Sequence, residues 1–188
     1  MGPHSVTVER AQEMQDFINS LLNPVRRQIF VSYHHANEQA FYAEFSSVFA
    51  HLYEVISDNS LARQIESDNP EYVIRRIRES YITGSSCTVV LCGPETPWRK
   101  YVDWEIKATL DKAHGLIGVN LPNNPRDAQG KVYTPDRLYD NIVSGYAVWI
   151  SWADLGGGPD VLRQYVELAN SKPRGLCQNE RPLRRRNG

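Results

Sequence analysis

The sequence predicts an α/β fold in which one doubly wound, mostly parallel sheet is flanked by helices within a single domain. Strand-like and helix-like segments alternate along the chain. Two of the strand-like segments, "CTVVLCG" and "LIGVNL", carry apolar residues on both faces, which is typical of parallel strands covered by helices on each side. A chain of 188 residues with 41% apolar residues is long enough for one domain with a sizeable core.

The first elements along the chain are a helix, a strand and a second helix. Apolar residues recur at helical spacing over residues 6–22, and Pro24 ends this N-terminal helix because the residue before a proline avoids the helical region. A short strand is expected over residues 28–32, followed by a helix over about residues 38–52. Residues 55–57 are a weaker strand candidate, and the polar segment after them has no clear periodicity.

The elements that follow are better defined. Asp68 or Asn69 is a suitable N-cap, and Pro70 suits the first turn of the next helix. The strand "CTVVLCG" is followed by a helix that carries Glu105, and "LIGVNL" then supplies another strand. After a loop over residues 122–135, "YAVWISW" is expected to form the last strand and "GPDVLRQYVELA" the last helix. These elements divide the chain into an N-terminal helix (residues 1–23), the α/β domain (24–170) and a basic tail (171–188).

Composition limits the cellular setting and the partners. We find no apolar run of roughly 20 residues for a membrane helix and no signal peptide, so a cytoplasmic protein without a membrane partner is expected. The three cysteines suit a reducing compartment, with Cys87 and Cys92 acting as small hydrophobes in their strand. The tail carries six basic residues against Glu180, but it has no aromatic residue to stack on bases. We therefore expect a flexible tail and no nucleic-acid partner.

The site is expected where three loops leave the carboxyl ends of the strands, over residues 33–37, 57–69 and 93–100, because ligands bind there in doubly wound sheets. Glu105, between Trp104 and Ile106, should lie beside these loops. An acid in the first turns of a helix can also simply stabilise the helix dipole while facing water. The position alone does not decide between a functional and a structural role.

Three stretches in order, "RRQIFVSYHHANE", "CTVVLCGPET" and "RKYVDWEIKATLDKAHGLIGVNLP", resemble the TIR domain. They are most similar to the bacterial TIR-like branch typified by ThsB of Thoeris anti-phage defence. The resemblance extends more loosely through "AVWISWADLGGG" and covers roughly residues 26–170. It implies a TIR or flavodoxin-like fold.

In the enzymes of this family, a glutamate on the corresponding helix serves NAD⁺ cleavage, and the matching residue here is Glu105. The resemblance implies that NAD⁺ is a substrate, that no separate cofactor is needed, and that the product is a nucleotide signal of the cyclic ADP-ribose type. This signal would activate an effector protein after a phage-derived trigger. The chain departs from the family at Tyr101, where tryptophan is common. Tyrosine keeps an aromatic face at this position.

The chemistry of the bond explains why one carboxylate suffices. Nicotinamide leaves as a neutral molecule, so the leaving group needs no general acid. The enzyme has to stabilise an oxocarbenium-like ribose, as in glycoside hydrolysis. A carboxylate that binds the ribose hydroxyls does this by placing negative charge beside the developing cation, and apolar neighbours such as Trp104 strengthen the effect.

The remaining candidates would bind the substrate. The turn from Ser32 through Tyr33, His34 and His35 leads into a helix N-terminus, which favours phosphate. Hydroxyl and ring N–H groups of this turn can donate hydrogen bonds, and Arg99 or Lys100 can reach a phosphate. Tyr33 and Trp98 are candidates to stack on a base. The full expected set, besides Glu105, is Ser32, Tyr33, His34, His35, Gly93, Trp98, Arg99, Lys100 and Tyr101.

Other interpretations remain open at this stage. His34 and His35 beside Glu38 suggest a metal, but no third ligand at suitable spacing is evident, so none is expected. A non-catalytic TIR-like scaffold, acting through self-association, is the main alternative to an enzyme. A receiver domain is disfavoured because Ser32, Tyr33 and His34 stand where such domains carry acids.

Overall fold

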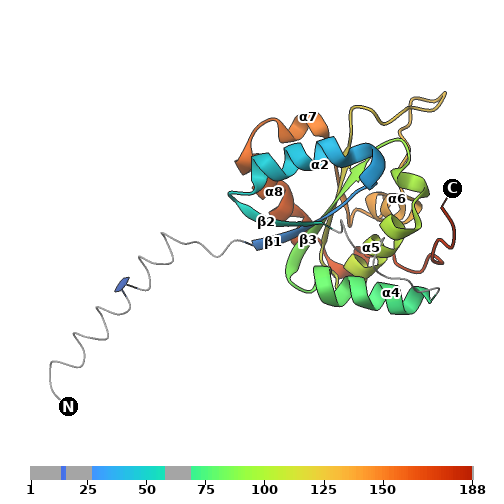
Figure 1. Cartoon of the computed structure of the whole chain (residues 1–188), viewed down its shortest axis with the longest axis horizontal. Coiled ribbons are helices and arrows are strands. Elements are labelled where there is room, and N and C mark those ends of the chain that lie inside the picture. The colour runs from blue at the N-terminus through green and yellow to red at the C-terminus, as the bar shows by residue number, and fades with distance from the viewer. Residues whose placement is uncertain (1–13, 16–26, 58–68, 188) are drawn as a thin grey trace, which may run out of the picture.

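The computed structural model describes residues 14–15, 27–57 and 69–187. Its centre is one five-stranded sheet in which all strands are parallel, in the order β2-β1-β3-β4-β5 (Figure 1). The strands are β1 Arg27–Ser32, β2 Tyr53–Ser57, β3 Ser85–Cys92, β4 Gly115–Asn120 and β5 Val148–Ser151. The predicted doubly wound fold is confirmed, including the weaker strand candidate, which is β2.

Helices cover both faces of the sheet, so the molecule has three layers. Figure 1 shows α2 and α7 above the sheet and α4 and α5 below it. The upper layer is made of α2 His35–Phe49, α7 Trp152–Leu155 and α8 Pro159–Asn170. The lower layer is made of α4 Pro70–Ile77 with its π-helical continuation η1 Arg78–Ile82, α5 Lys100–Asp111 and α6 Asp136–Val143. Two short 3₁₀ turns, η2 Thr96–Trp98 and η3 Arg174–Leu176, complete the elements within the described residues.

The two-sided apolar pattern of β3 explains this layering. Cys87, Val89 and Leu91 pack with side chains of the upper layer, whereas Val90 and Cys92 pack with the lower layer. All five side chains are fully buried. Burial raises the pKa of both thiols, as expected for cysteines that only pack in a core. The prediction that these two cysteines are packing residues is confirmed.

The predicted start of helix α4 is confirmed. The side chain of Asn69 caps α4 by accepting hydrogen bonds from the backbone N–H groups of Glu71 and Tyr72 at 3.0 and 3.3 Å, and Pro70 opens the helix. The predicted N-terminal helix lies outside the described residues, except for residues 14 and 15, which are helical. No helix within the described ranges combines the length and apolar character required to cross a membrane.

The C-terminal segment, residues 171–187, differs from the flexible tail that its charge pattern predicts. The structure lays it along α5 and α6. The fully buried guanidinium of Arg137 donates to Asp103 Oδ1 at 2.9 Å and to the backbone carbonyl of Arg181 at 2.9 Å. The carbonyl of Arg184 accepts from the indole N–H of Trp104 at 2.9 Å. Main-chain carbonyls of the segment thus satisfy buried donors of the domain, which a charge count cannot reveal.

Candidate active site at the carboxyl ends of strands β1 and β3

The strand order locates the place where a ligand is expected to bind. The chain leaves β1 toward α2 on one face of the sheet, and it leaves β3 toward α5 on the other. Because β1 and β3 are neighbours, the two connections diverge at their carboxyl ends, which is where ligands bind in folds of this kind. We call this place between the two connections the crevice. Most of the residues that the sequence singles out lie on these two connections.

Glu105 lies on the sheet-facing side of α5. One helical turn after it, the hydroxyl of Thr109 is 2.7 Å from that of Thr88 on β3. Since α5 runs back against the strands, the turn of about 5.4 Å from Thr109 to Glu105 matches two residues of strand, from Thr88 to Val90. Val90 pairs with Ser32, so Glu105 stands at the level of the last residue of β1.

Glu105 is only 5% exposed, and its neighbours Trp104 and Ile106 pack into the lower layer. The interpretation of Glu105 as a helix-dipole acid that faces water is therefore wrong. The predicted location beside the strand ends is correct. An acid held here acts in a medium of low polarity, where its charge has a larger effect than in water.

Ser32 and His34 extend along the end of β1 toward the same crevice. Ser32 is 1% exposed, and its hydroxyl has no hydrogen-bond partner among the described residues. His34 has extended backbone angles and forms the N-cap of α2, so its side chain follows the same side of the chain as that of Ser32. Burial, assisted by Arg99 and then His35, lowers the pKa of His34, which favours the neutral imidazole.

Glu38 is a site residue that the sequence analysis did not select for binding or catalysis. It lies in the first turn of α2 and is fully buried. Neither carboxyl oxygen has a described hydrogen-bond partner of normal distance and angle, although the backbone of His34 and the hydroxyl of Thr96 are near enough to favour its ionised form. One of these oxygens is 3.9 Å from Nδ1 of His34. Burial raises the pKa of Glu38 from 4.5 to about 7, outweighing the opposing influence of nearby polar groups and of Arg99.

Gly93, at the end of β3, makes room for this carboxyl group. A Cβ atom on Gly93 would lie 2.3 Å from Oε1 of Glu38, so any side chain there would displace the acid. The signal available in the sequence was the pair itself, an acid four residues after a strand-end histidine and a glycine at the end of the next central strand. Because a first-turn glutamate usually faces water, that signal was weak.

The loop after β3 adds a second acid and a cation. Glu95 forms an ion pair with Arg99, and its Oε2 is also 3.7 Å from Nδ1 of His34. The hydroxyl of Thr96 holds the loop in place by accepting from the backbone N–H of Gly93 at 3.0 Å and donating to the carbonyl of Leu91 at 3.2 Å. Glu95 and Arg99 are therefore held against the end of β1.

Two candidates on the β1–α2 turn point elsewhere. Tyr33 stacks on Tyr42 of α2 with 4.6 Å between ring centroids, and its hydroxyl donates to Gln39 at 2.9 Å. This ring belongs to the upper layer and does not offer a free face in the crevice. His35 is the first residue of α2 and is exposed. Successive residues of a strand point to opposite faces of the sheet. Tyr33 directly follows Ser32, so its ring lies on the opposite face, in the upper layer.

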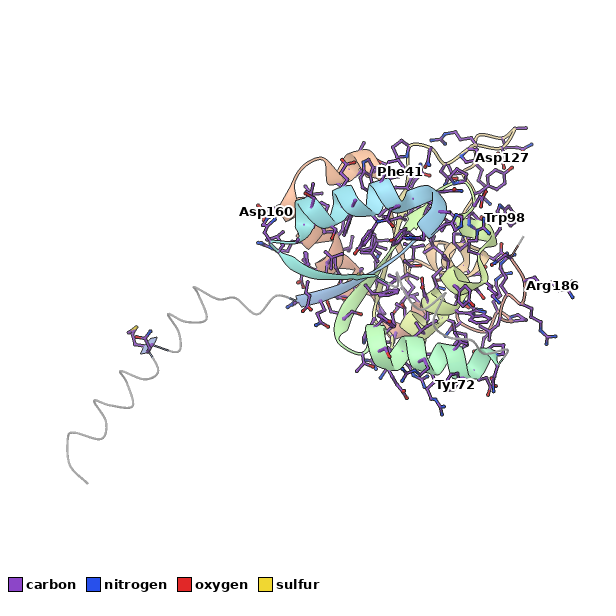
Figure 2. All side chains as sticks on the ribbon, viewed as in Figure 1. Phe41, Tyr72, Trp98, Asp127, Asp160 and Arg186 are labelled. Atoms are coloured by element: carbon purple, nitrogen blue, oxygen red, sulfur yellow. The ribbon has the colours of Figure 1, made fainter. Side chains whose placement is uncertain are left out.

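Three more candidates lie on the side of the C-terminal segment. Figure 2 shows Trp98 at the edge of the molecule, between the loop of Asp127 and the segment of Arg186. Trp98 is 41% exposed and has the guanidinium of Arg184 5.8 Å from its ring centroid. The ammonium group of Lys100 lies over the rings of Tyr101 and Trp104, at 5.0 and 5.4 Å. These side chains form a separate aromatic and basic patch.

The residues that the structure gathers at the crevice thus differ from the expected set. Of the ten candidates, Ser32, His34, Gly93, Arg99 and Glu105 converge at the ends of β1 and β3. Glu38 and Glu95 join them. Among the described residues, the crevice thus has buried carboxyl groups, an imidazole whose lowered pKa favours the neutral form, and a guanidinium, which suits the binding of a sugar and the handling of charge and protons.

The parallel 2-1-3-4-5 sheet, with this cluster at the switch point and an acid on the helix after β3, defines a TIR-like α/β domain. Residues 30–126 match the family described as Thoeris protein ThsB, TIR-like domain. Because this match covers just over half of the chain, the protein belongs to that family. The match includes every residue of the crevice and ends in the loop before α6. A search of curated proteins found no match to the chain.

Proposed function

We propose that this protein is a TIR-like enzyme of Thoeris-type anti-phage defence that cleaves the nicotinamide–ribose bond of NAD⁺. The observation that carries the proposal is the burial of Glu105 at the level of Ser32, at the switch point of the sheet. Acids removed from bulk water at the ligand-binding edge of a sheet are a recurrent feature of active sites, because their charge has a larger effect on a bound substrate there. Membership of the ThsB family supports the same function.

The proposed mechanism assigns the ribose to Glu105. Its carboxylate accepts hydrogen bonds from the ribose hydroxyls, and these bonds strengthen as the sugar becomes cationic in the transition state. The C–N bond breaks with its electron pair on the pyridinium nitrogen, so nicotinamide departs as a neutral molecule. The hydroxyl of Ser32 and the guanidinium of Arg99 are donors at the crevice that can serve hydroxyl or phosphate oxygens.

The product in this proposal is a cyclic ADP-ribose-type messenger that activates an effector protein. Cyclisation requires a nucleophile from the same dinucleotide to reach the ribose carbon before water does. A crevice that holds the substrate folded and excludes water favours that outcome. Ser32 and Glu38 are both buried beside the crevice, which supports a site with little water.

The test compares purified wild type with Glu105→Gln and a matched control, Glu44→Gln, which alters an exposed acid on α2. Nicotinamide release from NAD⁺ is measured, and the nucleotide product is identified by mass spectrometry in cells challenged with phage. We expect Glu105→Gln to lose at least about 10²-fold in rate, in line with the loss of one preorganised electrostatic group, while Glu44→Gln keeps the wild-type rate. Equal rates for Glu105→Gln and wild type would contradict the assignment. No cleavage by any form, with strong self-association, would favour the scaffold.

A further inference from the structure

Unpartnered buried polar atoms are concentrated at one place. Among the described residues, seven side chains carry a buried nitrogen or oxygen atom without a hydrogen-bond partner. Four of the seven, Ser32, His34, Glu38 and Arg99, lie at the carboxyl ends of β1 and β3. Buried polar groups in folded proteins are normally satisfied, so a cluster of exceptions indicates a place built for a ligand or a reaction.

His34 and Glu38 are the two members of this cluster that can move a proton near neutral pH. The fully buried carboxyl of Glu38 is 3.9 Å from Nδ1 of His34, and the Glu95 carboxyl is 3.7 Å from the same atom. These separations exceed hydrogen-bond length, as catalytic contacts often do before a substrate binds. With Nδ1 facing two carboxyl groups, the proton of a neutral imidazole belongs on Nδ1, and Nε2 is left as the basic nitrogen.

The fold places this pair within reach of Glu105. Glu105 stands at the level of Ser32, and His34 follows Ser32 by two residues on the same side of the chain. Two residues of extended chain span about 6.6 Å, which is the scale of one ribose and its attacking group. The side chain of His34 keeps 17% of its surface exposed, whereas that of Glu38 has none, so His34 is the member that can meet a substrate.

We propose that His34 is the general base for the nucleophile that attacks the ribose carbon, and that Glu38 is the positioning residue that holds its ring and stabilises the imidazolium. This inference rests on the proposed NAD⁺ cleavage and adds a role that Glu105 does not fill. A hydroxyl nucleophile, from a ribose of the same dinucleotide or from water, must lose its proton as it bonds to carbon. Neither nicotinamide departure nor ribose stabilisation removes that proton.

The step balances without any further reactant. The hydroxyl oxygen forms a bond to the ribose carbon, and the C–N bond breaks with its electron pair on nicotinamide. The hydroxyl proton moves to Nε2 of His34, and the new positive charge lies beside Glu38. The other charged groups facing His34 are Glu95, Arg99 and His35. Glu95 and Arg99 form an ion pair, so their opposite charges largely cancel in their effect on His34.

A nucleophile that carries no proton separates this role from a structural one. A pyridine base such as 3-acetylpyridine can replace nicotinamide on the ribose by attack through its ring nitrogen, so that exchange needs no general base. We expect His34→Asn to reduce formation of cyclic ADP-ribose and ADP-ribose by about 10²- to 10⁴-fold. Exchange with 3-acetylpyridine should stay within about threefold of wild type. The control is His51→Asn, the same substitution at an exposed turn after α2.

Glu38→Gln supplies the second readout, because glutamine keeps the shape but cannot balance an imidazolium. In wild type, product formation should rise through about pH 7 as Glu38 ionises, and this dependence should disappear in Glu38→Gln. Equal losses of exchange and product formation in His34→Asn would overturn the proposal, because they would indicate a binding or folding role. Unchanged product formation would overturn it as well. If wild type performs neither reaction while both variants fold, the proposed function itself fails.

Discussion

The buried carboxyl of Glu38 makes a quantitative prediction about stability that does not depend on any enzyme activity. Its pKa is about 7 in the folded protein against 4.5 ordinarily. Between these values the folded state holds a proton that the unfolded state has released, so the free energy of unfolding falls as pH rises. At roughly 1.4 kcal/mol per pKa unit, the shift corresponds to about 3 kcal/mol lost from pH 4.5 to pH 8.

Glu38→Gln should remove this loss, because glutamine does not titrate. The assay is urea denaturation of both proteins at several pH values, and the quantity of interest is the difference in free energy of unfolding between them. This comparison cancels the titrating groups that do not contact Glu38. His34 does contact it, and its lowered pKa acts in the opposite direction as pH falls below 6.5, so both proteins carry His34→Asn in this assay. Relative to the protein that keeps Glu38, we expect the free energy of unfolding of the Glu38→Gln protein to increase by about 3 kcal/mol between pH 4.5 and pH 8. A difference that stays constant over this range would show that Glu38 is not buried as described.

Three further predictions test the site and its supports. Glu105→Gln should abolish nicotinamide release without lowering the melting temperature by more than a few degrees; a fully active variant would refute its role. Gly93→Ala should destabilise the protein by about 1–3 kcal/mol in urea, since the new Cβ meets the carboxyl of Glu38, and this loss should shrink in a Glu38→Ala background. Arg137→Met should cost about 3–5 kcal/mol, because Asp103 is left buried without its cation, and it should expose the C-terminal segment to trypsin. Unchanged trypsin resistance would contradict the packing of this segment along α5 and α6.

The layers of the fold were predictable because they follow from short-range patterns. The two-sided apolar run of β3 predicted a strand buried between helices, and Asn69 followed by Pro70 predicted the start of α4. Both signals act within a few residues, so no knowledge of distant segments is needed. The position of Glu105 followed from the same reasoning combined with the family motif around it.

The composition of the crevice was only partly predictable. Tyr33 was expected to stack on a base, yet alternation along β1 sends it to the layer opposite Ser32, and there it packs on Tyr42. Glu38 was considered only as a possible metal ligand. Its burial depends on Gly93, which is far away in sequence and reaches it only because β1 and β3 are neighbours in the sheet.

The packing of the C-terminal segment was also not predictable from the sequence. Its six basic residues and its prolines are typical of a flexible tail. The contacts that hold it use main-chain carbonyls, which every residue has, and their donors are Arg137 and Trp104 in distant helices. Side-chain composition therefore carries no information about this packing.

The amino-acid sequence by itself determined the order of strands and helices, the two-sided core and the acid that follows β3, because apolar periodicity and capping are local properties. Only the tertiary structure decided which polar groups meet. The pairing of β1 with β3 brings His34 and Glu38 to the glycine at the end of β3, and removal from water then sets the charge state of these groups. Proton affinity at a buried site depends on neighbours in space, and those neighbours are separated in the chain by whole elements of the fold.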